Sequence, residues 1–147
     1  MPAPDLPAAP GTYMLILRLD APARIIPGRL GPCELPAGLY AYVGSAHGPG
    51  GLRARLARHL RHDKLRHWHI DALTAAAYPV AIWATAAPDR LECTWARALA
   101  ALPGVTLPVA GFGSSDCACP AHLFALPEGM LRAAWRALGQ PDEIRYT

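Results

Sequence analysis

A change in the spacing of apolar residues at Leu52 is the feature that most constrains the fold of this chain. Before it, residues 13–19 and 39–45 form short apolar runs bounded by glycine or aspartate, as is typical of strands. From Leu52 onward, apolar residues recur every three or four positions, as on one face of a helix. Strands first, then helices with strands between them, predict an α/β (α+β) domain with a small central, mostly antiparallel sheet flanked by helices.

The same two periods predict the remaining elements. A strand or hairpin interrupted by proline and glycine is expected over residues 25–35, and short strands over 80–85 and 122–126. A loop rich in glycine and serine is expected over 111–119. Helices are expected from Leu52 and over three further apolar stripes: 65–76, 91–102 with Pro88 as the first helical residue, and 131–138 closed by Gly139.

The composition is that of one globular domain. The 147 residues are 52% hydrophobic and 17% charged, enough for a single core. We expect a loose N-terminal tail over 1–10, one domain over 11–140 and a C-terminal tail over 141–147. Apolar stretches end well before the ~18 residues of a membrane span, and the proline-rich start lacks the basic region of a signal peptide. A cytoplasmic protein with reduced cysteines is therefore the default expectation.

Positive charge is concentrated in residues 53–69, although the formal net charge is only +3. A clustered basic face is the electrostatic footprint expected for a phosphate backbone, and a solvated helix face is the alternative explanation. The side chains assigned to nucleic-acid contacts are Arg53, Arg58, Arg61, Lys64, Arg66, His67 and His69.

Two short strings on expected strands, Gly11-Thr12-Tyr13 and Tyr42-Val43-Gly44, precede the basic segment. At ~100° per residue, Arg55 and His59 lie together on one edge of the apolar stripe that begins at Leu52, where the helix meets the sheet. Side chains four residues apart on one helix face can contact a single phosphate. Glu92 lies at the margin of a later stripe, where a carboxylate is suited to hold a divalent ion.

The order and local spacing of these residues resemble those of the GIY-YIG endonuclease superfamily. In that superfamily the motif tyrosines lie on neighbouring strands, an arginine on the next helix contacts the scissile phosphate, and a glutamate on a later helix binds the metal. The resemblance implies structural roles for Gly11 and Gly44 and one Mg²⁺ or Mn²⁺ ion held by Glu92. It implies catalytic roles for Tyr13, Tyr42, Arg55, His59 and Glu92.

A closer resemblance, spanning nearly the whole chain, is to a GIY-YIG-like branch, some members of which are fused to endonuclease III-type DNA glycosylases. It rests on residues 36–46, 67–71, 92–93 and 111–119. The implied function is a metal-dependent DNA endonuclease in DNA repair, acting on structured or damaged duplex. A DNA-repair glycosylase or another repair protein is the implied protein partner, and no membrane is expected.

Departures from the superfamily pattern leave other functions open. Thr12 replaces an isoleucine, an extra strand or hairpin separates the two motifs, Ser45 stands where many members have lysine, and the chain contains no asparagine. The alternative is a nucleic-acid-binding module of the same fold with weakened catalysis. A phosphodiesterase acting on RNA or a small molecule is a third candidate.

The sequence contains two other groups of metal-ligating residue types. His67 and His69 with Asp71 resemble a metal-binding pair, but two positions apart on a helix their imidazoles point in different directions. Cys117 and Cys119 with His122, completed by Cys33 or Cys93, lack the spacing of a standard zinc ribbon, so structural zinc is not expected. A tight loop beside the active site is expected instead, with contributions from Ser45, Ser115, Asp116, Cys117, Cys119 and His122.

Overall fold

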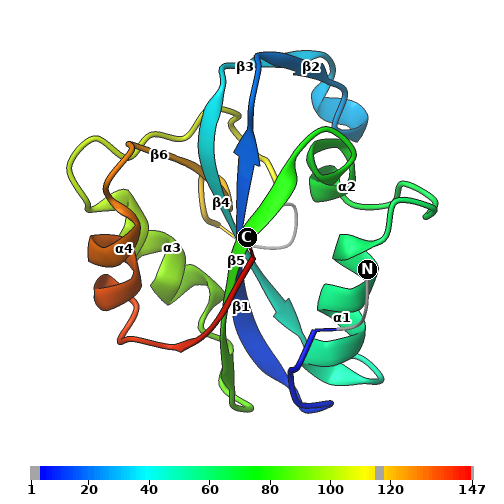
Figure 1. Cartoon of the computed structure of the whole chain (residues 1–147), viewed down its shortest axis with the longest axis vertical. Coiled ribbons are helices and arrows are strands. Elements are labelled where there is room, and N and C mark those ends of the chain that lie inside the picture. The colour runs from blue at the N-terminus through cyan, green and yellow to red at the C-terminus, as the bar shows by residue number, and fades with distance from the viewer. Residues whose placement is uncertain (1–3, 115–117, 147) are drawn as a thin grey trace.

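The computed structural model, which describes residues 4–114 and 118–146, is built around one five-stranded antiparallel sheet (Figure 1). The strand order is β6-β4-β1-β5-β7, and every neighbouring pair is antiparallel. This arrangement confirms the predicted fold class. The strands are β1 (Gly11–Leu19), β4 (Gly38–Ala46), β5 (Tyr78–Ala86), β6 (Leu123–Leu126) and β7 (Asp142–Arg145).

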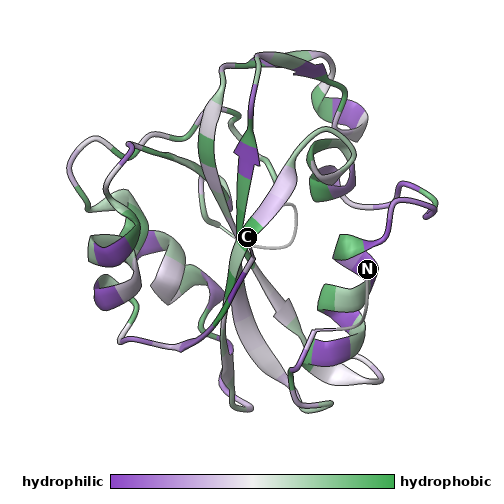
Figure 2. Cartoon of the chain, in the orientation of Figure 1, coloured by the Kyte–Doolittle hydropathy of each residue, from purple (hydrophilic) through white to green (hydrophobic). Residues whose placement is uncertain are grey.

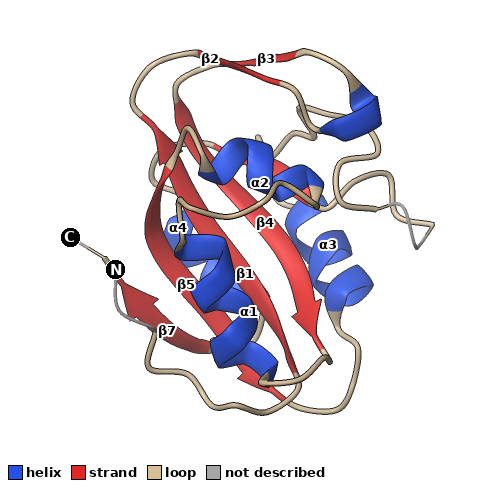
Figure 3. Cartoon of the chain, turned by 90° about the vertical axis from the view of Figure 1, so that its right-hand side faces the viewer, coloured by secondary structure: helices blue, strands red, loops and turns tan. Residues whose placement is uncertain are grey.

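Helices cover both faces of the sheet (Figures 1 and 3). On one face lie α1 (Gly51–Leu60) and α2 (His69–Thr74), and on the other lie α3 (Glu92–Ala100) and α4 (Leu131–Ala137). A separate ribbon of β2 (Ala23–Ile25) and β3 (Cys33–Leu35), joined through a 3₁₀ turn (Gly28–Leu30), stands at one end of the sheet. Among the described helices, none has the length and apolar character needed to cross a membrane.

The central strand β1 supplies both hydrophobic cores. Leu15 and Leu17 point to the core under α1 and α2, and Met14 and Ile16 point to the core under α3 and α4. A strand that is buried on both faces is apolar along its whole length instead of alternating, which explains the continuous apolar run at this position. Figure 2 shows hydrophobic and hydrophilic stretches alternating along the helices, as expected for elements with one face on the sheet.

Two helices begin later than the apolar stripes predict. The helix expected over 65–76 begins only at His69, and the side chain of Leu65 is 90% exposed. The helix expected to begin at Pro88 begins at Glu92, where the Leu91 amide donates to the hydroxyl of Thr12. Polar side chains thus bind the amides at both helix starts, Asp71 at α2 and the distant Thr12 at α3, and these contacts set the boundaries.

The two expected tails pack onto the domain in the parts that the structure describes. Leu6 is buried, and the carbonyls of Ala9 and Pro7 accept hydrogen bonds from amides in the first turn of α1. The expected C-terminal tail contains β7, which pairs with β5 at the edge of the sheet. Both segments therefore belong to the domain, which corrects both expectations. Their backbone hydrogen bonds are made with distant parts of the chain and cannot be read from the composition of a short segment.

The buried carboxylate of Asp71 ties the end of α1 to the start of α2. It accepts two hydrogen bonds of 2.9 Å from the guanidinium of Arg58 and further bonds from the amides of His67 and Trp68. Burial alone would raise the pKa of Asp71, but these donors hold the carboxyl pKa at about 2. Arg58, one of the cations that the sequence assigns to nucleic-acid contacts, instead forms an ion pair with this buried carboxylate.

Lys64 completes this clasp, which consists of Arg58, Lys64 and Asp71. Its ammonium donates to the carbonyls of Arg58 and His59 and lies 3.9 Å from the Asp71 carboxylate. A cation at the last carbonyls of a helix satisfies acceptors that have no intrahelical partner. The segment between α1 and α2 is thus held by buried charge, while Leu65 at its tip faces solvent.

The Asp71 clasp predicts a specific acid sensitivity. Because the pKa of the folded carboxyl is about 2 and that of an unfolded aspartate is ~3.9, the charged form stabilises the fold at neutral pH. That stability is present above ~pH 4 and is lost as the pH falls toward 2. Urea unfolding of Asp71→Asn should show a free energy lower by about 2–4 kcal/mol at pH 7, with the difference from wild type shrinking by roughly 2 kcal/mol at pH 2.

Asp63→Asn is the matched control, because the Asp63 side chain is 92% exposed. Its ion pair with Arg61 has a long nitrogen–oxygen distance of 3.9 Å. It should follow the wild-type pH profile. A constant difference between Asp71→Asn and wild type across the acid range would contradict the clasp as the source of the effect.

Candidate active site

A pocket of about 370 Å³ lies beside the C-terminal part of β4. Strand β6 pairs with β4 from Leu39 to Tyr42, and one more bond runs from the Val43 amide to the His122 carbonyl. Beyond that point β4 stays paired with β1, and Gly44 and Ser45 of β4 line the pocket. Four of the five residues assigned catalytic roles line it: Tyr13, Tyr42, Arg55 and Glu92.

Both motif glycines make room for close packing. Gly44 is directly opposite Tyr13 in the β1–β4 pair, and a Cβ added at Gly44 would overlap the hydroxyl and ring carbons of that tyrosine. A Cβ at Gly11 would overlap the side chain of Leu52 and the carbonyl of Thr85. Gly44 thus lets the Tyr13 ring lie across β4, and Gly11 lets α1 approach the sheet.

Tyr13 and His59 form a buried, hydrogen-bonded pair behind the pocket. The phenolic oxygen lies 2.6 Å from Nε2 of His59, whose side chain is 2% exposed. Burial raises the pKa of Tyr13 well above its usual value, and burial also lowers the pKa of His59 to about 3. Both groups are neutral at pH 7, and the direction of the hydrogen bond depends on which ring nitrogen of His59 carries the proton. Among the described residues, Nδ1 has no hydrogen-bond partner.

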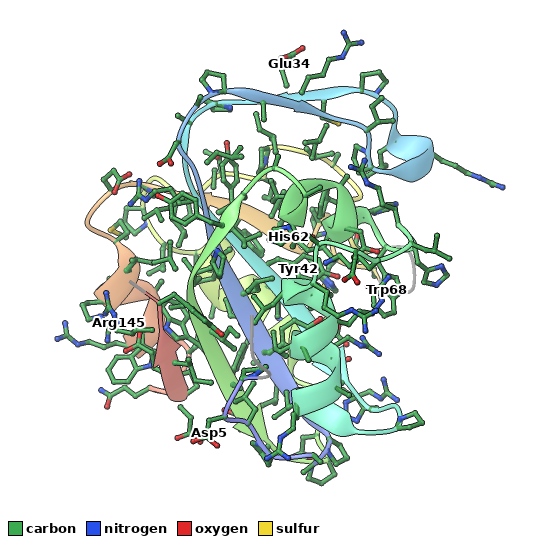
Figure 4. The ribbon with its side chains drawn as sticks, turned by 45° about the vertical axis from the view of Figure 1, so that its right-hand side comes forward. Asp5, Glu34, Tyr42, His62, Trp68 and Arg145 are labelled. Carbon is green, nitrogen blue, oxygen red and sulfur yellow. The ribbon has the colours of Figure 1, made fainter. Side chains whose placement is uncertain are left out.

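Arg55 is held at the pocket by a backbone bond and an aromatic ring. Its Nη1 donates to the carbonyl of Ser45 over 2.9 Å, and its guanidinium lies 4.5 Å from the ring centroid of Trp68. Arg58 stacks on the same ring at 4.2 Å. Figure 4 shows Tyr42 and Trp68 on the side of the sheet that α1 covers. Trp68 was not among the predicted site residues; its signal in the sequence is an aromatic residue inside the basic segment.

Glu92, the first residue of α3, reaches the pocket from the other face of the sheet. The hydroxyl of Ser45 donates to its Oε1, and its Oε2 lies 3.7 Å from Nδ1 of His122. Burial lowers the pKa of His122, so this contact joins a carboxylate to a neutral ring at pH 7. The Glu92 side chain is 26% exposed. One such carboxylate, completed by water and substrate phosphate, suits Mg²⁺.

The histidine group and the cysteine group considered in the sequence as metal ligands have different outcomes in the structure. His69 accepts a hydrogen bond from the Gly113 amide at Nδ1, while Asp71 belongs to the clasp, so neither gathers with His67 around a common point in the described structure. The Cys33 thiol donates to the carbonyl of Gly31. Cys119 and His122 do come together with Cys93 near the pocket wall. The predicted loop contributors Ser115, Asp116 and Cys117 lie outside the described residues.

The basic segment divides into internal and exposed cations. Arg58 and Lys64 belong to the clasp. Arg53, Arg61 and Arg66 are exposed, although Nε of Arg53 also donates to the Leu6 carbonyl. The exposed cations follow α1 and the segment after it, on the side of the sheet that carries Tyr13 and Arg55.

Comparison with known proteins places the chain in a family. The sequence model described as "Domain of unknown function DUF123" matches residues 12–140, nearly the whole described domain, and the chain therefore belongs to that family. Searches of curated proteins and of solved structures each return no match.

The packing of Tyr13 on Gly44 predicts a large effect for one methyl group. Gly44→Ala should displace the buried ring, break the Tyr13–His59 hydrogen bond and lower the free energy of unfolding by about 1–3 kcal/mol. Chemical denaturation measures the loss, and the pH titration of the His59 ring by NMR reports the hydrogen bond.

Gly48→Ala is the matched control, since an added Cβ there meets nothing within 4 Å. Adding Tyr13→Leu to Gly44→Ala should recover part of the lost stability, because the overlapping ring is gone. Additive losses in this double-mutant cycle would show that the two residues do not pack as described.

Proposed function

We propose that this DUF123 domain is a metal-dependent phosphodiesterase that cleaves DNA. The observation that carries the proposal is the convergence of Tyr13 from β1, Arg55 from α1 and Glu92 from α3 on one polar pocket. Phosphodiester hydrolysis needs a group that accepts a proton from water, positive charge at the phosphate and stabilisation of the leaving oxygen. Each of the three side chains supplies one of these requirements.

Arg55 would hold the non-bridging oxygens of the phosphate. Its planar guanidinium presents several donors, of which the Ser45 carbonyl uses one, and the Trp68 ring fixes the orientation of the plane. A preoriented cation in a partly buried pocket stabilises developing negative charge without reorganising at the moment of reaction.

The Tyr13–His59 pair offers a route for the proton of the attacking water. A free phenol, with a pKa near ~10, is a poor general base at neutral pH unless its own proton can leave. The 2.6 Å contact allows the phenolic proton to pass to Nε2 of His59 as the phenolic oxygen accepts a proton from water. Burial raises the free energy of the resulting imidazolium of His59. The negative charge of a phosphate in the pocket would offset part of this cost.

Glu92 would bind the ion, and Ser45 would orient its carboxylate. The Ser45 hydroxyl occupies one lone pair of Oε1 and so fixes the direction of the remaining ones. A bound Mg²⁺ or Mn²⁺ ion would supply positive charge to the leaving oxygen. Ser45, which stands where many members of the GIY-YIG superfamily carry lysine, would thereby gain a role toward the carboxylate.

The exposed cations favour a nucleic acid over a small phosphodiester. Arg53, Arg61 and Arg66 extend the positive charge beyond the pocket along α1 and the following segment. Side chains of this kind contact flanking phosphates and position a duplex without reading its sequence. The pocket would then act on the phosphate that these contacts bring to Arg55.

Incubation of the purified protein with branched, nicked and plain DNA duplexes in Mg²⁺ or Mn²⁺ tests the proposal. Cleavage is expected with the wild type, and Tyr13→Phe, Arg55→Ala and Glu92→Gln should each lower the rate at saturation by about 100-fold or more, because each removes a group that acts in the transition state. Circular dichroism should show that the three variants remain folded.

Glu34→Gln, at an exposed carboxylate on β3, should cleave like the wild type (Figure 4). Binding of every duplex with no cleavage by the wild type would identify a nucleic-acid-binding module and overturn the proposal of catalysis. Wild-type rates for Glu92→Gln would overturn the assignment of the ion to Glu92.

The division of the basic segment predicts which cations set the salt dependence of binding. Arg61→Ala with Arg66→Ala should weaken binding to all duplexes alike and reduce the slope of log K against log salt by roughly two, one for each phosphate that the variant no longer neutralises. Arg97→Ala with Arg136→Ala, at exposed cations on α3 and α4, should leave the slope unchanged. Equal slopes for the two double variants would show that Arg61 and Arg66 do not contact phosphates, and the basic segment would then be a solvated surface.

A further inference from the structure

A cluster of two thiols and one imidazole lies in the wall of the pocket. The ligand atoms of Cys93, Cys119 and His122 are all within 4.8 Å of one another, and the two sulfur atoms are 2.9 Å apart. No other group of three or more His, Cys, Asp or Glu side chains is this close within residues 4–114 and 118–146. This thiol–imidazole cluster has no part in the proposed hydrolysis.

The fold brings these three side chains together from separate places. Cys93 is the second residue of α3, Cys119 lies in the connection between α3 and β6, and His122 directly precedes β6. The spacing of Cys119 and His122 alone does not indicate a zinc site, because Cys93 lies 26 residues earlier and joins them only through tertiary packing. The connection over residues 101–122 is long, and long connections in compact domains usually carry a function.

The geometry is close to that of a tetrahedral metal centre. Zinc binds sulfur at ~2.3 Å and imidazole nitrogen at ~2.0 Å, so two ligand atoms on one ion lie ~3.4–3.8 Å apart. The sulfur–sulfur separation of 2.9 Å and the other separations of at most 4.8 Å reach these values when each changes by no more than ~1.4 Å. A disulfide requires a sulfur–sulfur bond of ~2.05 Å, which the 2.9 Å separation does not match.

We propose that Cys93, Cys119 and His122 form a binding site for Zn²⁺, with its fourth coordination position facing the pocket. The direction follows from the lining of the pocket, to which both Cys93 and His122 contribute beside Glu92. Cys119 is not among the residues that line this pocket, and it lines a separate apolar groove with Ala96 and Phe124. Three protein ligands and one open position are the arrangement of zinc sites that act on a substrate, whereas structural zinc sites have four protein ligands.

The donor types separate this site from the one at Glu92. Thiolate and imidazole ligands select zinc over magnesium, which prefers carboxylate and water oxygens. Since His122 lies near both Glu92 and the thiols, a bound Zn²⁺ ion would fix the imidazole beside the Glu92 carboxylate. Zinc would also join the connection before β6 to α3. Binding of zinc here does not depend on the protein being a nuclease.

Metal titration of the reduced, metal-free protein under anaerobic conditions tests the site directly. Competition with a chromophoric chelator should show one Zn²⁺ bound per chain, and Co²⁺ should give the thiolate charge-transfer and ligand-field bands of a tetrahedral sulfur site. Cys93→Ser and Cys119→Ser should each weaken binding by about 100-fold or more, because each removes a direct ligand. Cys33→Ser is the matched control and should bind like the wild type, since this thiol lies on β3.

Alkylation of the wild type tests the same site without a substitution. Saturating Zn²⁺ should slow the modification of Cys93 and Cys119, measured by peptide mass spectrometry, and leave Cys33 unchanged. Absence of Zn²⁺ binding by the wild type, unchanged binding by Cys93→Ser, or equal protection of Cys33 and Cys93 would each overturn the proposal. Recovery of a Cys93–Cys119 disulfide from a protein that binds no Zn²⁺ would identify a redox pair in its place.

Discussion

The pairing of β1 with both of its neighbours is the constraint on which the rest of the structure depends. Its register with β4 places Tyr13 opposite Gly44, and its register with β5 places Tyr13 opposite Ala84. Side chains alternate between the two faces of a strand, so a slip of one residue would exchange the two cores and turn Tyr13 away from α1. The hydrophobic burial of β1 on both faces holds this register, and the position of every group in the pocket follows from it.

Burial determines the chemistry that these groups can perform. Removal of water from Tyr13 and His59 favours the neutral form of each, which leaves a short hydrogen bond between two uncharged rings. On the pocket side, this pair faces the formal charges of Arg55 and Glu92. An anionic ligand that binds beside Arg55 and Glu92 would therefore change the balance between the neutral and charged forms of Tyr13 and His59.

Charge in the basic segment has two different physical roles. The ion pair between Arg58 and Asp71, with Lys64 on the last carbonyls of α1, organises the segment and stacks a guanidinium on Trp68. This stacking in turn supports Arg55 on the same ring. The exposed arginines do not take part in that network in the described structure, so they are available to a ligand. A count of basic residues does not distinguish these roles, because burial and the partner of each side chain decide them.

The sequence by itself determined the class of fold and most of the elements, since strand and helix periods are local properties of the chain. It also predicted that Tyr13, Arg55 and Glu92 belong to one site. That prediction rests on a resemblance in the order of residues along the chain, which can be recognised without knowledge of packing. Only the tertiary structure decided the later starts of α2 and α3, the strand β7 and the internal role of Arg58, since each depends on contacts made in the folded chain. The same reason applies to Cys93 and Cys119: no spacing along the chain places their thiols together, and packing of α3 against the connection before β6 does.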